Sequence, residues 1–388
     1  MSFNVFKNTV LLFLLIMISC GSKSKTKYGR QKTEYGRQKT EDGRQKMRVE
    51  NSKLGANELK LKANKLNTEN CQLNTILVGA NQTEKYLQLL NRKRVGIVAN
   101  QTSVIFYDKR RKTEDRSFTH LVDSLISLKV DVKNVFAPEH GFRGTADAGE
   151  KVKDGIDTKT GLPIISLYGK NRKPTTEHLK NIDIMIFDIQ DVGARFYTYI
   201  SSLHYVMEAC AELNIPLLIL DRPNPNAHYV DGPILEPKHQ SFVGMHPVPV
   251  VHGMTIGEYA KMINGESWLE NGIKCEITVI PVENYVHNTF YSLLIKPSPN
   301  LPSDRAINLY PSLCFFEGTN VSIGRGTDKQ FQVYGSPFIA DVDINYCFTP
   351  QPNKGAKYPK HQGIECCGFD LNDGERLNEI NLSYLLKM

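Results

Sequence analysis

The stretch IDIMIFDIQD, residues 182–191, is an almost continuously apolar run that turns polar at its end. Such a run is typical of a strand buried on both faces of a parallel sheet. Comparable runs occupy 94–100, 130–136, 163–167 and 216–220, and predicted helices lie at 118–128 and 201–213. Strands that alternate with helices predict βαβ units. The sequence therefore predicts an α/β fold with a doubly wound, mostly parallel sheet and helices on both faces.

Polar clusters follow four of these strands at the point where each strand ends. In doubly wound sheets, ligands bind outside the carboxyl ends of the strands. The clusters are 100–102, 138–141, 188–195 and 221–226. A single cluster could be a helix cap or a turn, but four that converge on one edge predict a polar cleft there.

The net charge is located in the N-terminal region. The chain has 388 residues, enough for two domains, and a formal charge of +7. Residues 21–53 carry 11 Lys and Arg against 4 Asp and Glu. With Lys7 also set aside, 36 basic and 37 acidic residues remain, a net charge of −1. The rest of the chain gives no electrostatic reason to expect a nucleic-acid partner.

Residues 1–20 have the pattern of a signal peptide. Lys7 precedes the apolar stretch VLLFLLIMI, residues 10–18, which is too short to span a bilayer. It ends in Ser19-Cys20-Gly21 and resembles a bacterial lipoprotein signal. That resemblance implies a lipid on Cys20 and a membrane-anchored protein of the cell envelope that faces the periplasm. The alternative is a chance cysteine in an ordinary signal peptide.

Residues 21–74 are predicted to form a disordered basic linker. Its residues 27–47 are three copies of a seven-residue repeat, KYGRQKT EYGRQKT EDGRQKM. No repeat position is consistently apolar, which excludes a coiled coil.

Apart from Cys20, seven cysteines remain without a C-x-x-C pair. An odd number in this arrangement argues against a disulfide framework or a zinc site.

The stretch FAPEHGFRGTADAGEKV, residues 136–152, places several charged groups beside a strand end. Glu139 is a candidate general acid or base, and His140 and Arg143 are candidate substrate contacts. The glycines of this stretch allow tight turns. The alternative is a Glu–Arg pair that organises a turn.

Four further stretches carry candidate site residues, at 188–203, 220–226, 251–255 and 316–338. In 188–203, Asp188 and Asp191 are candidate catalytic carboxylates, although Asp191 could instead cap a helix or pair with Arg195. The remaining candidate substrate contacts from these stretches are Arg195, Tyr197, Tyr199, Asp221, Arg222, His252, Glu317, Asn320, Arg325 and Asp328. Each has a structural alternative: packing for the tyrosines, turn capping for Asp221 and a buried role for His252.

Cofactor motifs are not found in the sequence. Gly324-Arg325-Gly326 is not a phosphate loop, no G-x-G-x-x-G follows the first strand, and there is no H-E-x-x-H. We therefore expect neither a cofactor nor a metal.

Six motifs together resemble the exo-acting β-N-acetylmuramidases. They are EHGFRG, DIQDVGARFYTY, LDRPNPN, GMHPVPVVHGMTIGEYA, PSPNLPS and FEGTNVSIGRGT, and the likeness runs from about Arg94 to the end of the chain. The resemblance implies a Rossmann-like catalytic domain, here 75–300, and a smaller C-terminal α/β domain, here 301–388. It also implies removal of N-acetylmuramic acid from non-reducing ends of peptidoglycan fragments in wall turnover or recycling, with Glu139 as the key catalytic residue.

Glycoside hydrolysis normally uses two carboxyl groups. Asp188 and Asp191 are the nearest partners of Glu139 by strand-end position, and the substrate's 2-acetamido group is the alternative nucleophile. Muramic acid carries a lactyl carboxylate, for which Arg143, Arg195 and Arg325 are the candidates. The chain ends early in a helical pattern, NLSYLLKM, so we expect a truncated C-terminal domain. A decayed lipoprotein that binds muropeptides without cutting them is the alternative function, and a periplasmic binding protein is a third.

Overall fold

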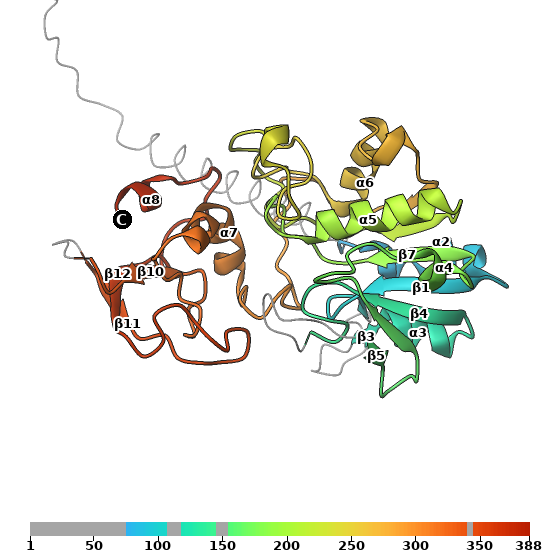
Figure 1. Cartoon of the computed structure of the whole chain (residues 1–388), viewed down its shortest axis with the longest axis horizontal. Coiled ribbons are helices and arrows are strands. Elements are labelled where there is room, and N and C mark those ends of the chain that lie inside the picture. Colours follow the sequence, from blue (N-terminus) through green and yellow to red (C-terminus); the bar gives the residue numbers. More distant parts are fainter. Residues whose placement is uncertain (1–74, 107–117, 145–153, 340–343) are drawn as a thin grey trace, which may run out of the picture. The chain divides into compact units, whose positions relative to one another are not determined.

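The apolar runs form one seven-stranded sheet (Figure 1). The computed structural model describes residues 75–106, 118–144, 154–339 and 344–388. The strands lie in the order β5-β6-β4-β1-β7-β8-β9. Their bounds are β1 (Arg94–Ala99), β4 (Asp131–Ala137), β5 (Gly155–Ile156), β6 (Pro163–Ser166), β7 (Ile184–Asp188), β8 (Leu217–Leu220) and β9 (Ile277–Ile280). Only β5 is antiparallel to its neighbour, which confirms the predicted α/β class.

The strand order reverses at β1. This strand pairs with β4 on one side, where Ile97 faces Val135, and with β7 on the other, where Ile97 faces Ile186. The chain first builds the sheet outward through β4 and β6 and then returns to the other side of β1. In open α/β sheets such a reversal opens a crevice beyond the carboxyl ends of the strands. The topology therefore places a ligand site beyond the ends of β1, β4 and β7.

Alternate strand residues belong to two different cores. Val98, Phe187 and Ile219 pack in one apolar cluster, which includes residues of α5 (Tyr199–Glu212) and α6 (Ile256–Gly265). Their neighbours, such as Ile97 and Ile186, pack in a second cluster with α3 (Leu121–Ser127). Successive residues of a strand point to opposite faces, so the sheet is covered on both sides, as Figure 1 shows.

One predicted helix begins later than the sequence indicates. Residues 118–128 have helical spacing, but Phe118–His120 form β3, which pairs with β2 (Val104–Phe106). The His120 backbone is extended, and its Nδ1 accepts the N–H of Val122 at 3.3 Å. This side chain thereby caps α3, which fixes the start of the helix at Leu121.

Shorter elements complete the described part of the chain. They are η1 (Gly79–Asn81), α2 (Thr83–Tyr86), η2 (Leu87–Leu90), α4 (Thr176–Leu179), η3 (Pro237–His239), η4 (Glu270–Gly272), α7 (Asp304–Leu313), η5 (Cys314–Gly318) and α8 (Ser383–Leu386), with β10 (Val333–Ser336), β11 (Tyr346–Phe348) and β12 (Cys366–Asp370). The last three strands form an antiparallel sheet in the order β10-β12-β11. The α5-side core also takes in Leu309 and Tyr334, so the domain limit at residue 300 stays a prediction.

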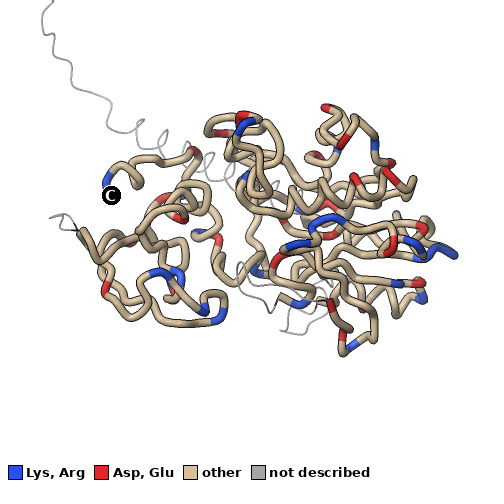
Figure 2. The backbone as a smooth tube through the Cα atoms, viewed as in Figure 1, with Lys and Arg blue, Asp and Glu red and all other residues tan. Residues whose placement is uncertain are grey.

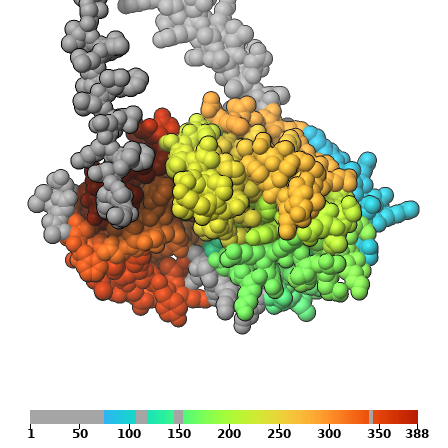
Figure 3. Space-filling view, turned by 45° about the horizontal axis from the view of Figure 1, so that its top comes forward, coloured from blue at the N-terminus to red at the C-terminus, as the bar shows by residue number. Residues whose placement is uncertain are grey.

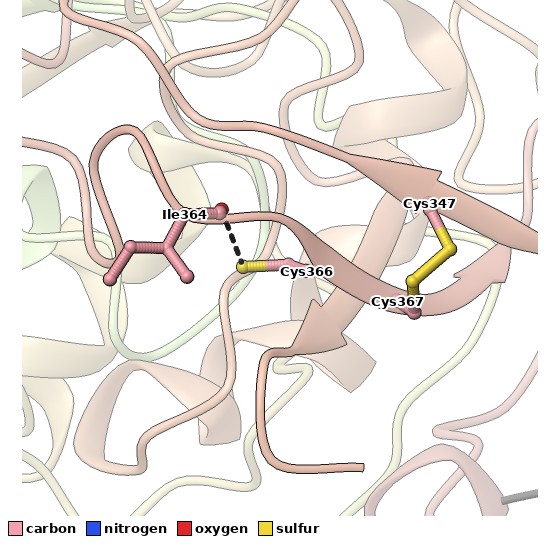
Figure 4. Close-up of a disulfide and its surroundings, with 4 residues drawn as sticks. All are labelled: Cys347, Ile364, Cys366 and Cys367. Atoms are coloured by element: carbon pink, nitrogen blue, oxygen red, sulfur yellow. Dashed lines mark hydrogen bonds between the residues drawn. A yellow bond between two sulfur atoms is a disulfide. The ribbon is translucent and has the colours of Figure 1, made fainter. Parts of the chain in front are cut away.

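A disulfide joins the two strands β11 and β12. Figure 4 shows the Cys347–Cys367 bond between residues that face each other in register, beside the buried thiol of Cys366. The sequence argument against disulfides is wrong for this pair. Its partners are 20 residues apart and meet only because the strands pair, which cysteine spacing does not reveal. Cys210, Cys275 and Cys314 are buried free thiols.

Charges of both signs are distributed over the described part of the chain, as Figure 2 shows. Within the described ranges, no helix is both long and apolar enough to cross a bilayer. The predicted signal peptide with Cys20, the repeats at 27–47 and the rest of the linker lie outside the described residues.

Candidate active site

Glu139 follows β4 in a tight turn. The Gly141 N–H donates to the Pro138 carbonyl at 3.0 Å, and His140 has a φ of 70°. Left-handed backbone at a non-glycine residue costs roughly 1–3 kcal/mol and concentrates at functional sites. Gly144, also at positive φ, has the side chain of Gln101 within 2.8 Å of where a Cβ would stand. Packing thus holds this turn beyond the end of β4, and both Glu139 and His140 line a cavity.

Hydroxyl groups surround the Glu139 carboxylate. Thr198, just before α5, donates from Oγ1 to Glu139 Oε2 at 2.8 Å. Burial and then the Glu139 charge raise the pKa of Tyr168 to about 12, so this neighbour stays a neutral phenol. Asn100, the residue after β1, donates to the Tyr199 hydroxyl at 2.9 Å, and that hydroxyl lies 3.4 Å from the Glu139 carbonyl. Residues at the start of α5, after β6 and after β1 therefore contribute to the position of Glu139.

The cavity beside Glu139 has a volume of about 590 Å³. Such a volume is typical of a small-molecule site. Its walls come from the loops after β4 and β6, the segment before α5, a loop at 241–243, the stretch 298–301, and residues of and beyond α7. In Figure 3, the yellow segment around residue 240 meets both the green surface and the orange-to-red C-terminal surface. The lining residues are Glu139, His140, Tyr168, Arg172, Phe196, Tyr197, Thr198, Ser241, Phe242, Val243, Ser298, Asn300, Leu301, Tyr310, Glu317, Arg325 and Phe331.

Five predicted site residues meet on this wall. They are Glu139, His140, Tyr197, Glu317 and Arg325. Arg325 Nη2 donates to Glu317 Oε1 at 2.8 Å, so these two side chains form an ion pair within the cavity wall. Tyr197 packs edge-on against Tyr310, and Tyr310 against Phe331, which gives the cavity an aromatic side.

Asp188 and Arg222 do not line the cavity. Arg222 Nε and Nη2 donate to the two carboxylate oxygens of Asp188 at 2.6 and 2.9 Å. The side chains are 0% and 3% exposed. A bidentate pair buried to this degree satisfies both charges and leaves neither group accessible to a substrate. The catalytic role predicted for Asp188 and the contact predicted for Arg222 are not supported by this placement.

Asp191 and His252 lie off the wall as well. Asp191 Oδ2 accepts from the Gly193 N–H at 2.7 Å and lies 3.4 Å from His252 Nε2. Burial, with smaller contributions from Asp191 and other neighbours, raises the pKa of Tyr197. Asp191 thus belongs to the loop that follows β7 and does not line the cavity.

Two of the three predicted carboxylate-binding arginines are engaged elsewhere. Arg143 Nη2 binds Asp157 at 2.7 Å and Asp123 at 3.2 Å, which organises the turn after Glu139. Arg195 Nη1 donates to the carbonyls of Pro233 and Val248 at 2.8 and 2.5 Å. Neither lines the cavity, so of these candidates only Arg325 does.

The remaining candidates have structural positions. Asp221 accepts from Thr255 Oγ1 and from the Gly257 N–H, both at 2.8 Å, and so caps α6. Burial raises its pKa to about 6. It borders a separate cavity of about 430 Å³. Tyr199 is buried, and its hydroxyl accepts from Asn100. Asn320 and Asp328 are exposed and do not line the cavity.

Sequence reasoning missed several residues of the wall. Arg172 stacks on the ring of Phe242 at 4.2 Å, and Thr198 and Tyr168 flank Glu139. Asn300 donates through Nδ2 to the Gly355 carbonyl at 2.8 Å, which leaves its buried Oδ1 without a partner among the described residues. Asn300 belongs to the PSPNLPS motif, interpreted from the sequence only as a linker. The loops that carry Arg172 and Phe242 show no periodicity or motif.

The cavity contains no metal-ligand cluster among the residues that the structure describes. Away from the cavity, one group of acidic residues in the described part of the chain could hold a cation: Glu208, Glu212 and Glu270. Lys173 donates to Glu208 at 2.7 Å and to Glu212 at 2.6 Å, so its ammonium group already balances charge in this cluster.

Known proteins match both parts of the chain. Family models described as exo-β-N-acetylmuramidase NamZ match at residues 95–305 for the N-terminal domain and 308–387 for the C-terminal domain. A peptidoglycan β-N-acetylmuramidase NamZ of Bacillus subtilis is 41% identical over 301 residues, which are 74% of this chain and 69% of that protein.

Two crystal structures of DUF1343 family proteins from Bacteroides fragilis are also similar. One is 48% identical with a TM-score of 0.71 and covers 80% of this chain and 82% of its own. The other is 30% identical with a TM-score of 0.65 and covers 76% of each chain.

Proposed function

Since the chain belongs to the exo-β-N-acetylmuramidase NamZ family, we propose that it removes N-acetylmuramic acid from non-reducing ends of peptidoglycan fragments. The observation that carries the proposal is the position of Glu139, held by Thr198 on the wall of a sugar-sized cavity at the topological switch point. A carboxyl group in that place suits general acid catalysis at a glycosidic bond.

The reaction needs one proton donor and one attacking group. Glu139 donates its proton to the departing glycosidic oxygen as the bond to the anomeric carbon breaks. Water then supplies the new oxygen at that carbon, either directly or after transient attack by the substrate's own acetamido oxygen. In both routes Glu139 has the same role at the departing oxygen.

Glu317 is the second carboxylate on the described wall. Its ion pair with Arg325 restricts its orientation within the cavity wall. We assign to Glu317 the role that sequence analysis predicted for Asp188 or Asp191: activation of water or orientation of the acetamido group. Asp191 accepts from the Gly193 N–H at 2.7 Å and lies off the wall, so we assign it a structural role in its loop.

Polar atoms on the wall suit a sugar amide. Asn300 Oδ1 is a buried acceptor, and Arg325 Nε and the Tyr197 hydroxyl are buried donors, each without a partner among the described residues. A buried polar group costs free energy unless a ligand satisfies it. The acetamido N–H suits Asn300 Oδ1, and the aromatic side formed by Tyr197, Tyr310 and Phe331 suits the apolar face of the ring.

We also propose that the protein is exported and attached to the cell envelope. The signal-like N-terminus supports lipidation at Cys20 and attachment to the cell envelope. The Cys347–Cys367 disulfide supports export, since disulfides persist in oxidising compartments. Replacement of Cys20 by Ser is expected to move the protein from the membrane fraction to the soluble fraction; unchanged fractionation would contradict the lipid anchor.

The direct test is sugar release. The full chain is incubated with the disaccharide MurNAc–GlcNAc, beside Glu139→Gln and the exposed control Glu177→Gln. We expect free N-acetylmuramic acid from the parent and the control, and a loss of about 10²- to 10⁴-fold in Glu139→Gln. Binding without release by the folded parent would favour the alternative, a muropeptide-binding protein without activity.

A further inference from the structure

We infer that Arg172, stacked on Phe242, binds the lactyl carboxylate of the muramyl residue and makes the site selective for muramyl over glucosaminyl ends. The inference rests on the proposed function, because that function defines the sugar. N-acetylmuramic acid differs from N-acetylglucosamine by this one acidic substituent. A site that selects it therefore needs a cation with unused hydrogen-bond donors.

Two arginines line the cavity, Arg172 and Arg325. Arg325 donates to Glu317 at 2.8 Å, so its charge is already matched by a carboxylate of the wall. Arg172 forms no ion pair or hydrogen bond with any residue that the structure describes, and its guanidinium lies over the Phe242 ring. Arg172 is thus the arginine of the described wall whose charge no carboxylate matches.

The stack leaves the donors of Arg172 available. Its guanidinium carbon lies 4.2 Å from the centre of the Phe242 ring. A contact with an aromatic ring uses none of the guanidinium N–H donors, so they are open for two parallel bonds to a carboxylate. Arg172 also acts on the Tyr168 hydroxyl, whose pKa burial and Glu139 raise and Arg172 lowers. The free cation and Glu139 therefore act on the same tyrosine of the cavity wall.

Phe242 is a fixed platform. Ser241 and Gly244 exchange backbone hydrogen bonds at 2.9 and 3.0 Å, which closes the loop tightly. Ser201 of α5 donates to the Phe242 carbonyl at 2.7 Å, and Tyr205 of α5 stacks beside its ring at 6.2 Å. A platform held in this way lowers the conformational cost of ordering the arginine when the ligand binds.

The test compares two substrates that differ in one charge. The full chain and Arg172→Gln, Arg172→Lys, Arg325→Gln and the loop control Lys170→Gln are assayed on MurNAc–GlcNAc and on its lactyl methyl ester. We expect kcat/KM of Arg172→Gln to fall about 10- to 150-fold on the acid and little on the ester, the range for hydrogen bonds to a charged group. Arg172→Lys should recover part of the loss, and Lys170→Gln should match the parent.

Other outcomes overturn the inference. Equal losses on both substrates would indicate a structural role for Arg172, and an effect confined to Arg325→Gln would assign the carboxylate to that residue. If the parent cleaves neither substrate, the proposed function fails by itself. Calorimetric binding of N-acetylmuramic acid and N-acetylglucosamine, with and without Arg172→Gln, then decides the inference independently: equal binding of both sugars by the parent would refute it.

Discussion

Glu139 and Asp188 stand at the same edge of the sheet and have opposite environments. Each follows or ends a strand beside β1, Glu139 after β4 and Asp188 at the end of β7. Glu139 accepts from a neutral hydroxyl on a cavity wall, whereas Asp188 is 0% exposed in a bidentate pair with Arg222. The position of a carboxylate at a strand end thus indicates the site, but its partner decides whether it can act.

The contrast extends to the arginines. Arg222 and Arg172 both follow strands of this sheet, β8 and β6. Arg222 neutralises Asp188 inside the protein, while Arg172 rests on an aromatic ring at the cavity. The Asp188–Arg222 pair is buried at the sheet edge, whereas Glu139 and Arg172 both line the cavity. The predictions below separate these roles.

The largest effect is expected for Glu139→Gln, the variant of the release assay. The amide keeps the shape of the side chain and the Thr198 contact but donates no acid proton. We expect the loss of turnover without a change in the free energy of unfolding, measured by urea denaturation. A variant that is also strongly destabilised would make Glu139 structural like Asp188.

Asp188→Asn is expected to show the reverse pattern. The substitution leaves the buried Arg222 charge without a matching carboxylate. Breaking a buried ion pair typically lowers the free energy of unfolding by about 3–5 kcal/mol. The protein that remains folded should keep the parent's kcat. An unchanged unfolding free energy together with a lost kcat would restore Asp188 as a catalytic residue.

Asp221, at the end of β8, gives a third and smaller effect. Its folded pKa of about 6 exceeds the ordinary 3.8, so the folded state binds this proton more tightly than the unfolded state does. Stability from this group is present below pH 4 and falls as pH rises through 6, by at most about 3 kcal/mol. Asp221→Asn should flatten the unfolding free energy between these pH values; an unaltered slope would assign the pH dependence to other groups.

Thr198→Val is expected to give the smallest effect. It removes the hydroxyl that donates to Glu139 Oε2 at 2.8 Å but keeps the volume of the side chain. A lost intramolecular hydrogen bond typically costs about 0.5–1.5 kcal/mol. We expect kcat to fall more than KM changes, about tenfold, in initial-rate measurements. A change in KM alone would place Thr198 in substrate binding.

The sequence predicts the sheet and its functional edge because both depend on local patterns. Apolar runs give the strands, and the residues after them give the edge where Glu139 lies. The pairing of Asp188 is not local: Arg222 comes from the neighbouring strand, and only the fold brings the two together. Arg172, Phe242 and the Cys347–Cys367 bond share this difficulty, since nothing in their flanking residues indicates the partner that each meets.

The cavity wall runs in sequence from Glu139 to Phe331, and the isolated bridge of Leu77 to Glu283 closes an even longer loop. Contacts between such distant segments form slowly, because the chain must first lose the entropy of closing them. A nascent chain that has formed β1, β4 and β7 still has no complete binding site. During refolding, enzymatic activity should therefore return later than the circular dichroism of the sheet.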